Sequence, residues 1–280
     1  MGVHLETVSG LLAIPLLAAT LLTASPPVRT VDVVPGAVVR WEAREGDQCS
    51  NGTESWAPLG KACYFGVDVQ LVAGALEIAL VRGGARETSV LNVLPSPYPD
   101  ERLTLDKRKV TLSAKDQERA RREREEVLPL FDLRGPAQFA LPVTAPLRGT
   151  PPYRNFGTRR ILNGEPRSRH GGADYKAAVG TPVLAVAPGR VALVANHFFS
   201  GRSVYVDHGD GLISMSMHLS RVDVKTGQEV RAGDRLGLSG ATGRVSGPHL
   251  HFGLRWRGAT IDPGALIGPG PHLIDLPGGP

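Results

Sequence analysis

The chain has 280 residues, of which 41% are hydrophobic and 21% charged, and it contains 34 glycines and 23 prolines. This length accommodates two modest domains, and the composition is typical of a turn-rich globular protein rather than a disordered polymer or a membrane bundle. The formal net charge of +5 favours polyanionic partners, but no basic stripe interleaved with aromatic residues is present, so we expect no nucleic-acid binding.

The chain opens with an apolar segment. Residues 11–22 are mostly apolar and are followed by Thr-Ala-Ser-Pro-Pro, although residues 1–10 contain Glu6 and no Lys or Arg. An apolar run before small residues is typical of a signal peptide, and this run is shorter than the roughly 20 residues that a membrane-spanning helix needs. We therefore expect a signal peptide over residues 1–25, export to the periplasm or elsewhere in the cell envelope, and no stable membrane span.

Residues 26–110 are predicted to form a small β-rich accessory domain, because short β-branched runs alternate with turn residues. The chain's only two cysteines, Cys49 and Cys63, flank a polar stretch in this region. In an oxidising compartment we expect them to close that stretch with a disulfide, and a pair of free thiols is the alternative. No second Cys or His pair lies nearby, so a zinc site is not expected here.

Residues 111–146 are expected to link two domains. Ser113-Ala-Lys-Asp116 resembles a capping box and precedes a charged run, which predicts a solvated helix over residues 113–128 that ends before Pro129. We expect its charges to serve solubility alone. Prolines recur between residues 129 and 152 and favour an extended connector, because proline lacks the backbone donor.

Residues 147–268 are predicted to form a second, nearly all-β domain. Short apolar runs are separated by glycine-containing turns, and no segment has a helical period. The fold class expected for the whole chain is therefore mainly β. The final residues, 269–280, are rich in Gly and Pro, so we expect a flexible tail.

Two histidines of this second domain are spaced for a shared site. His249 and His251 lie in Gly-Pro-His-Leu-His-Phe, and on an extended chain alternation places both imidazoles on one face with Leu250 between them on the other. Taken alone, a His-x-His pattern also fits two half-exposed strand histidines. The functional interpretation therefore depends on further donors elsewhere in the domain.

Such donors are present. His170-Gly-Gly-Ala-Asp174 offers an imidazole and a carboxylate on an extended or looping stretch, since two glycines make a helix unfavourable. His, His and Asp together satisfy the three protein ligands of a catalytic zinc site, which keeps a position for water. His218 follows another β-like run, and by itself it also fits a structural histidine.

These motifs resemble a known family over residues 156–266, the LytM/lysostaphin-type zinc metallopeptidases. The family pattern is His-x-Gly-x-Asp, a Gly-Thr-Pro-Val strand, His-Leu-Ser and Gly-Pro-His-Leu-His-Phe. In the same order, this chain has His170-Gly-Gly-Ala-Asp174, Gly180-Thr-Pro-Val183, His218-Leu-Ser220 and Gly247-Pro-His-Leu-His-Phe252.

The resemblance implies residue roles and a fold. It implies that His170, Asp174 and His251 bind one zinc ion, that His218 and His249 assist catalysis, and that the domain is an antiparallel, β-hammerhead-related sheet. The substrate implied is peptidoglycan, cut in its peptide cross-links or stems, with the D-alanyl to diaminopimelate bond as the first expectation and polyglycine bridges as the alternative. An envelope regulatory protein is a further partner that the family suggests.

Two other classes of function remain to be weighed. A non-catalytic LytM-like regulator, which binds cell wall or activates an amidase, would be expected to have lost metal ligands, whereas all five site positions are intact. Residues 181–191 and 224–234 resemble the β-hammerhead pattern of a lipoyl-type carrier, but no lysine lies in the Met-Lys type of turn that such a carrier modifies. We expect the N-terminal domain and its helix either to position the catalytic domain or to cover its groove.

Overall fold

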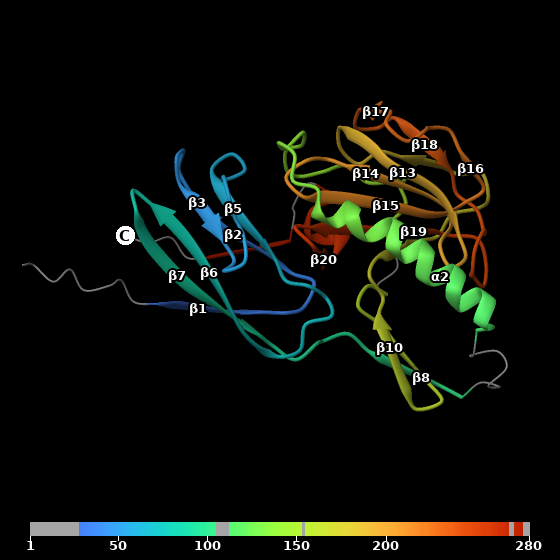
Figure 1. The fold of residues 1–280 in the computed structure, drawn as a ribbon, viewed down its shortest axis with the longest axis horizontal. Coiled ribbons are helices and arrows are strands. Elements are labelled where there is room, and N and C mark those ends of the chain that lie inside the picture. Colours follow the sequence, from blue (N-terminus) through green and yellow to red (C-terminus); the bar gives the residue numbers. More distant parts are fainter. Residues whose placement is uncertain (1–27, 105–111, 153–154, 269–271, 277–280) are drawn as a thin grey trace, which may run out of the picture.

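The structure is a computed structural model that describes residues 28–104, 112–152, 155–268 and 272–276. It is mostly β, as expected, with an N-terminal set of strands beside a larger C-terminal sheet (Figure 1). The signal peptide expected over residues 1–25 lies outside the described residues. Within those residues, no helix has both the length and the apolar character needed to cross a membrane.

The N-terminal region is built on a five-stranded sheet with the order β1-β7-β6-β3-β4. Strand β1 pairs in parallel with β7, and the remaining neighbours are antiparallel. Buried Ile78, Leu80 and Leu91 supply its core side. The strands are β1 (Arg29–Val33), β3 (Gln48–Ser50), β4 (Ser55–Trp56), β6 (Gly74–Arg82) and β7 (Ala85–Val93).

A second sheet, in the order β21-β2-β5, packs beside the first and includes the end of the chain. Its strands are β2 (Val38–Glu42), β5 (Ala62–Gly66) and β21 (Leu273–Asp275), and β21 pairs in parallel with β2. The expectation of a flexible tail over residues 269–280 is therefore wrong for its described part, which is paired in a sheet and ends on buried Leu276. The strand contains the apolar pair Leu273-Ile274, but the Gly and Pro residues around this pair masked it as a strand signal in the sequence.

A disulfide between Cys49 and Cys63 joins these two sheets. Cys49 lies on β3 and Cys63 on β5, and both side chains are fully buried in the apolar core between the sheets. The expected disulfide is thus confirmed, and the alternative of two free thiols is wrong.

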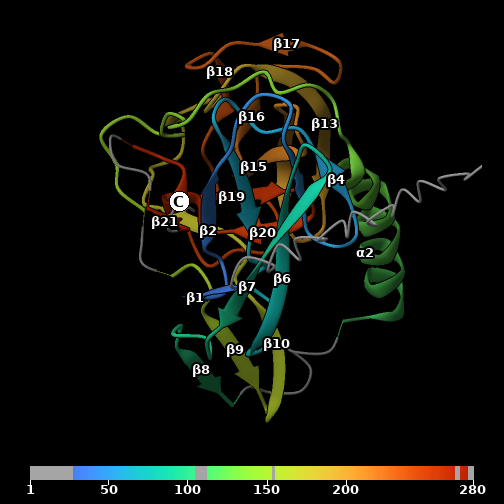
Figure 2. The same ribbon diagram turned by 90° about the vertical axis from the view of Figure 1, so that its left-hand side faces the viewer.

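A small three-stranded sheet, at the bottom of Figure 2, combines strands from both halves of the chain. Strand β8 (Asp100–Leu103) pairs in parallel with β9 (Arg159–Leu162), and β10 (Glu165–Arg169) completes this sheet. The boundary drawn at residue 110 therefore separates two strands that share a sheet. Sequence patterns did not indicate this pairing, because the strands are mostly exposed and polar.

Helix α2 spans Ala114–Val127 and continues into the 3-10 helix η1 (Leu128–Asp132). The Ser113 hydroxyl accepts a hydrogen bond from the Asp116 N–H at 3.1 Å, which caps one of the amides left unpaired at a helix start. α2 lies across the outer face of the C-terminal sheet, as Figures 1 and 2 both show.

The charges of α2 also have structural partners, so the expectation that they serve solubility alone is wrong. The Glu123 carboxylate accepts a hydrogen bond from the Phe198 N–H at 2.7 Å, and Glu126 lies 3.0 Å from the His197 ring. These contacts attach the helix to the end of strand β13 (Gly189–His197) and to the residue that follows it.

The C-terminal region contains one large antiparallel sheet in the order β11-β19-β15-β14-β13-β17, with β20 paired to β19. A small sheet in the order β12-β18-β16 lies against it. Between residues 173 and 268, the only other regular element is the 3-10 helix η2 (Pro263–Ala265). The strands are β11 (Ala173–Tyr175), β12 (Pro182–Leu184), β13 (Gly189–His197), β14 (Gly201–Asp207), β15 (Leu212–Leu219), β16 (Arg221–Val222), β17 (Glu229–Val230), β18 (Arg235–Leu238), β19 (Leu250–Trp256) and β20 (Ala259–Ile261).

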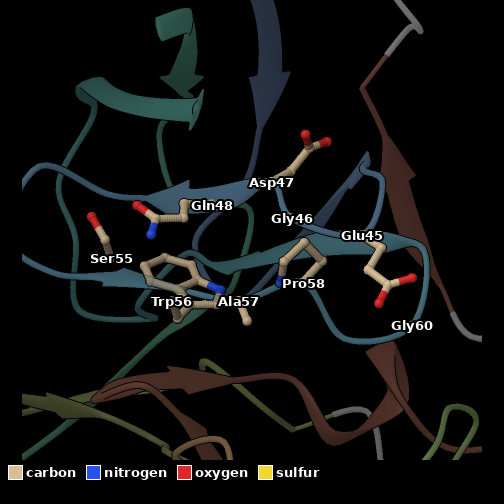
Figure 3. A pocket seen from close by; sticks show the side chains of 9 residues that line it. All are labelled: Glu45, Gly46, Asp47, Gln48, Ser55, Trp56, Ala57, Pro58 and Gly60. Carbon is tan, nitrogen blue, oxygen red and sulfur yellow. The ribbon is translucent and has the colours of Figure 1, made fainter. Parts of the chain in front are cut away.

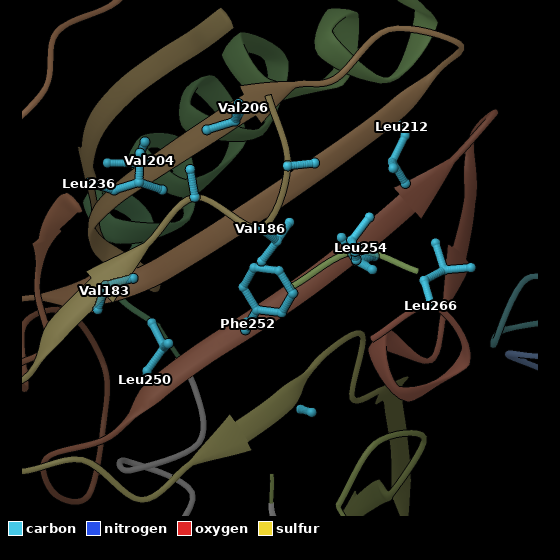
Figure 4. Close-up of a cluster of buried hydrophobic side chains, with 14 of the residues drawn as sticks. Val183, Val186, Val204, Val206, Leu212, Leu236, Leu250, Phe252, Leu254 and Leu266 are labelled. Atoms are coloured by element: carbon cyan, nitrogen blue, oxygen red, sulfur yellow. The ribbon is translucent and has the colours of Figure 1, made fainter. Parts of the chain in front are cut away.

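Alternation along β19 separates the core from the outer face of the large sheet. Leu250, Phe252 and Leu254 enter the apolar core that Figure 4 shows between the large and small sheets. His251 and Arg255 point to the opposite face, since successive side chains of a strand alternate. On that face η1 packs over Arg255, whose guanidinium lies 4.1 Å from the centre of the Phe131 ring.

His208, at the hairpin between β14 and β15, predicts a pH-dependent stability. Its side chain is fully buried, with Nδ1 2.8 Å from the Pro188 carbonyl and Nε2 2.8 Å from the Ser214 hydroxyl. Burial lowers the pKa of His208 below its usual value. As pH falls below about 6.5, His208 therefore takes up a proton in the unfolded chain before it does so in the folded one. The free energy of unfolding falls over this range, until the pH reaches the lower pKa of the folded state.

We expect the free energy of unfolding of the native chain to fall more between pH 7.5 and pH 5 than that of His208→Asn. Asparagine keeps a donor for the Pro188 carbonyl but does not titrate. Each unit by which the pKa is lowered is worth about 1.4 kcal/mol. Urea unfolding at the two pH values measures the difference, and equal losses in both proteins would contradict the prediction.

Candidate metal centre and adjacent histidines

Strand pairing brings the first two candidate ligands together. β11 pairs with β19 so that Asp174 lies directly opposite His251, and opposed residues of an antiparallel pair project from the same face. The flanking Ala173 and Phe252 enter the core. Asp174 and His251 therefore both face outward from the sheet.

His170 reaches the same point through the two glycines that precede β11. A Cβ atom on Gly172 would lie only 2.6 Å from His251 Nε2 and from the Phe252 carbonyl oxygen. The chain can thus bend tightly against β19 only because no side chain is present at Gly172. This close approach turns His170 back toward Asp174, as the spacing of the motif predicted.

The three donor atoms form a compact cluster, His170 Nε2, Asp174 Oδ1 and His251 Nδ1, within 4.8 Å of one another. The His170 and His251 nitrogens are 2.9 Å apart, and the Asp174 oxygen lies 3.4 Å and 3.0 Å from them. Donors of a tetrahedral zinc ion, each about 2.0–2.1 Å from the metal, are separated by about 3.3 Å. The residues present therefore fit zinc, in both donor type and spacing.

The two other candidate histidines lie beside this cluster. His249 immediately precedes β19, and its Nε2 is 3.8 Å from Asp174 Oδ1. The rings of His218 and His249 are 4.8 Å apart between centroids, and His218 lies 6.1 Å from the ring of His251. All five residues that the sequence singled out are thus brought together.

His218 reaches the outer face through an irregularity in β15. The preceding Met217 already packs on the outer face, whereas Leu219 enters the core. The register of β14 and β15 shifts at this point, and His218 has a φ of 65°, which is uncommon for a residue with a side chain. This bulge places two consecutive side chains on the outer face, which regular alternation would not allow.

Backbone carbonyls orient three of the four histidines. Nδ1 of His170, His218 and His249 lies 3.0, 3.0 and 2.9 Å from the carbonyl oxygens of Asn155, Thr242 and Gly247, respectively. Because a carbonyl oxygen only accepts, each Nδ1 carries the proton and each neutral ring presents the Nε2 lone pair to the site. None of these three carbonyls is visible as a sequence signal, since any residue type supplies one.

Burial and charge set the protonation states. Burial acts to raise the pKa of Asp174, but the neighbouring His170 and His251 outweigh it and hold the pKa well below its usual range. Burial lowers the pKa of His251, and it lowers the pKa of His218 to about 4. At neutral pH Asp174 is therefore ionised and His251 neutral, which are the forms that bind a metal ion.

The N-terminal half contacts the segment that carries His170. The Gln70 side chain accepts a hydrogen bond from the Arg169 N–H at 3.0 Å and donates one to the Arg169 carbonyl at 3.1 Å. The Arg169 guanidinium in turn donates to the Gly157 carbonyl. These contacts give Arg169 a structural role.

A separate hollow of about 610 Å³ lies in the N-terminal region, between β3 and the segment after β4 (Figure 3). Of its two acidic residues, Glu45 and Asp47, the second is already held by Arg82, whose guanidinium donates to the Asp47 carboxylate at 2.9 Å. That hydrogen bond keeps the pKa of Asp47 below its usual value. The hollow includes none of the five site residues, and we assign no chemistry to it.

Comparisons with known proteins find peptidases that are similar to the C-terminal half of the chain. Residues 168–263 match the model described as Peptidase family M23. The chain is 42% identical over 109 residues to the peptidoglycan DD-endopeptidase ShyA of Vibrio cholerae, which covers 39% of this chain and 25% of that protein. It is 36% identical over 149 residues to ShyC of the same organism, also named a peptidoglycan DD-endopeptidase, covering 52% of this chain and 32% of that one. The chain thus spans a quarter to a third of the length of these relatives.

One solved structure is similar across both halves of the chain. A putative peptidase M23 from Pseudomonas aeruginosa superposes with a TM-score of 0.63 at 29% identity, covering 82% of this chain and 92% of that one. Because the matched part exceeds residues 168–263, the likeness extends into the N-terminal strands. Another protein therefore shares the fold of both halves.

Loss of a ligand should abolish tight zinc binding. We expect His251→Ala and Asp174→Ala to weaken zinc binding by more than the 10–100-fold that loss of an outer partner costs. The matched control is His272→Ala, because His272 is exposed and lies outside the cluster. Competition with a chromophoric chelator measures the affinity, and unchanged affinity in both ligand variants would place the metal elsewhere.

Proposed function

We propose that this chain, whose residues 168–263 match the model described as Peptidase family M23, is a zinc-dependent endopeptidase that hydrolyses peptide cross-links or stems of bacterial peptidoglycan. The observation that carries this proposal is the His170, Asp174 and His251 cluster with His218 and His249 beside it. A metal site with three protein donors and adjacent acid–base groups suits amide hydrolysis by water.

When bound, zinc would lower the pKa of a coordinated water and polarise the scissile carbonyl. His218 stays neutral at pH 7, with its Nδ1 proton held by the Thr242 carbonyl, so its Nε2 can accept a proton. His249 offers a second Nε2 beside it. In their protonated forms, both imidazoles can donate hydrogen bonds to developing negative charge.

The side chains of the site are accessible to a substrate. His170, Asp174, His249 and His251 retain between 14% and 27% of their exposed area. The relatives named above are DD-endopeptidases, which favours a bond between two D-configured centres of a cross-link as the one cut. Hydrolysis of the polyglycine bridges of other cell walls is the alternative.

We further propose that the chain acts after export, in the periplasm or elsewhere in the envelope. The apolar run of residues 11–22 suits a signal peptide. The disulfide between Cys49 and Cys63 is the kind of bond that persists in oxidising compartments. Cell fractionation, with a thiol-labelling test of both cysteines, would contradict export if the protein were found reduced in the cytoplasm.

The cleavage rate should depend on His218 and His249, whereas zinc affinity should not. We expect His218→Ala and His249→Ala to retain zinc and to lose about 10²–10⁴-fold in cleavage rate, the usual contribution of a general acid or base. Mass spectrometry of muropeptides released from purified sacculi by the full chain measures the rate and identifies the bond. Chelation should abolish cleavage, and added zinc should restore it.

The outcomes of this experiment separate the two classes of function. Release of monomers from cross-linked dimers that requires both zinc and His251 supports the peptidase. Intact muropeptides from a zinc-loaded native chain would contradict it and favour a non-catalytic regulator. His272→Ala serves again as the matched control and should cleave at the native rate.

A further inference from the structure

We propose that Asn155 is a positioning residue that fixes two of the three metal ligands at once, His170 and Asp174. The inference rests on the proposed metal function of that cluster. Asn155 lies 15 and 19 residues before the two ligands and just outside the matched family region. It is not itself placed to hold the metal, because its contacts engage the sides of the ligands that face away from the cluster.

The side chain of Asn155 forms two hydrogen bonds with Asp174. Its Nδ2 donates a hydrogen bond to Asp174 Oδ2 at 2.7 Å, and its Oδ1 accepts one from the Asp174 N–H at 3.2 Å. Oδ2 is the carboxylate oxygen that does not face the histidines, since Oδ1 is the atom 3.0 Å from His251. The amide therefore selects which oxygen of Asp174 is offered to a metal ion and blocks rotation of the carboxylate.

The main chain of Asn155 holds the second ligand. Its carbonyl oxygen is 3.0 Å from Nδ1 of His170, so the His170 proton is directed to Nδ1 and Nε2 faces the cluster. Outer partners of this kind commonly fix the tautomer and ring orientation of a ligating histidine. One residue thus sets both the rotation of a carboxylate and the tautomer of an imidazole.

Asn155 can do this because its own segment is held rigidly. The Gly157 N–H donates to the His170 carbonyl at 2.9 Å, and the His170 N–H donates to the Thr158 carbonyl at 2.9 Å. A Cβ atom on Gly157, which has a φ of 72°, would lie 2.1 Å from the Tyr98 ring. Glycine is required at this close contact, and it ties the segment to the N-terminal half.

Tyr98 completes the support from that half. Its ring packs edge-on against Phe156, with centroids 5.4 Å apart, and its hydroxyl donates to the Pro35 carbonyl at 2.9 Å. The N-terminal half therefore acts on the metal cluster through Tyr98, Phe156 and Asn155. The N-terminal domain was expected to position the catalytic domain, and on this path Asn155 is the residue through which it would do so.

The test measures zinc affinity of the full chain, without substrate, by competition with a chromophoric chelator. Asn155→Ala removes both side-chain contacts to Asp174 but keeps the main-chain carbonyl, and Asn155→Leu removes the same contacts while preserving the side-chain volume. We expect each to bind zinc about 10–100-fold more weakly, the range for loss of an outer partner. Thermal unfolding of the metal-free proteins runs in parallel.

The matched control is Asn92→Ala. Asn92 makes the same type of contact on the N-terminal sheet, where its Nδ2 donates to Asp32 Oδ1 at 2.6 Å. Its loss should leave zinc affinity within twofold of the native value. Cobalt substituted for zinc gives a second readout, because its visible spectrum reports ligand geometry, and we expect an altered spectrum in the Asn155 variants alone.

Each outcome decides the proposal. Weakened zinc affinity and a changed cobalt spectrum, with metal-free unfolding temperatures close to native, establish the positioning role. Native zinc affinity in either folded Asn155 variant overturns it, even if cleavage is lost. If both variants unfold before binding can be measured, the residue is a stability determinant and the proposal is also overturned. Intact sacculi with native, zinc-loaded protein would instead refute the proposed function and leave the Asn155 result standing.

Discussion

The antiparallel pairing of β11 with β19 is the constraint on which the rest of the site depends. It fixes Asp174 opposite His251 and sends their neighbours into a core that a shift of one residue would expose. Leu250, Phe252 and Tyr175 are almost completely buried. A one-residue slip of the register would expose these apolar side chains to water and would therefore be strongly unfavourable. The hydrophobic core thereby protects the alignment of two polar residues on the opposite face.

The remaining site residues are placed by irregular backbone, each case with a different physical cause. His170 depends on a glycine that permits close approach to β19, and His218 depends on a bulge with left-handed backbone. Strained or special backbone of this kind is maintained where surrounding contacts over-determine it. Here the carbonyls of Asn155, Thr242 and Gly247 supply some of these contacts, because each holds the Nδ1 atom of a site histidine.

Sequence reasoning reached the five site residues and the mainly β class because both leave local signals. The His-x-His alternation indicated one shared face, and glycines around His170 indicated a non-helical approach. The supports of these residues could not be found in the same way. Thr242 and Gly247 act through carbonyls that every residue has, and Gln70 meets Arg169 across 99 positions of the chain. The pairing of β8 with β9 was hidden because polar, exposed strands carry no apolar alternation, and the final strand was concealed by its flanking glycines and prolines.

The two sheets that cross between the halves also govern how the chain can be divided. β9 is flanked by β8 and β10, and β21 is joined to β2. A fragment cut near residue 146 would keep β9 and β21 but lose the partners β8 and β2. Each would then present unpaired N–H and C=O groups, which are templates for association with other chains. The chain is therefore better regarded as one interleaved folding unit than as a catalytic module with a removable neighbour, and self-association of a severed half would reflect bare strand edges rather than any native assembly.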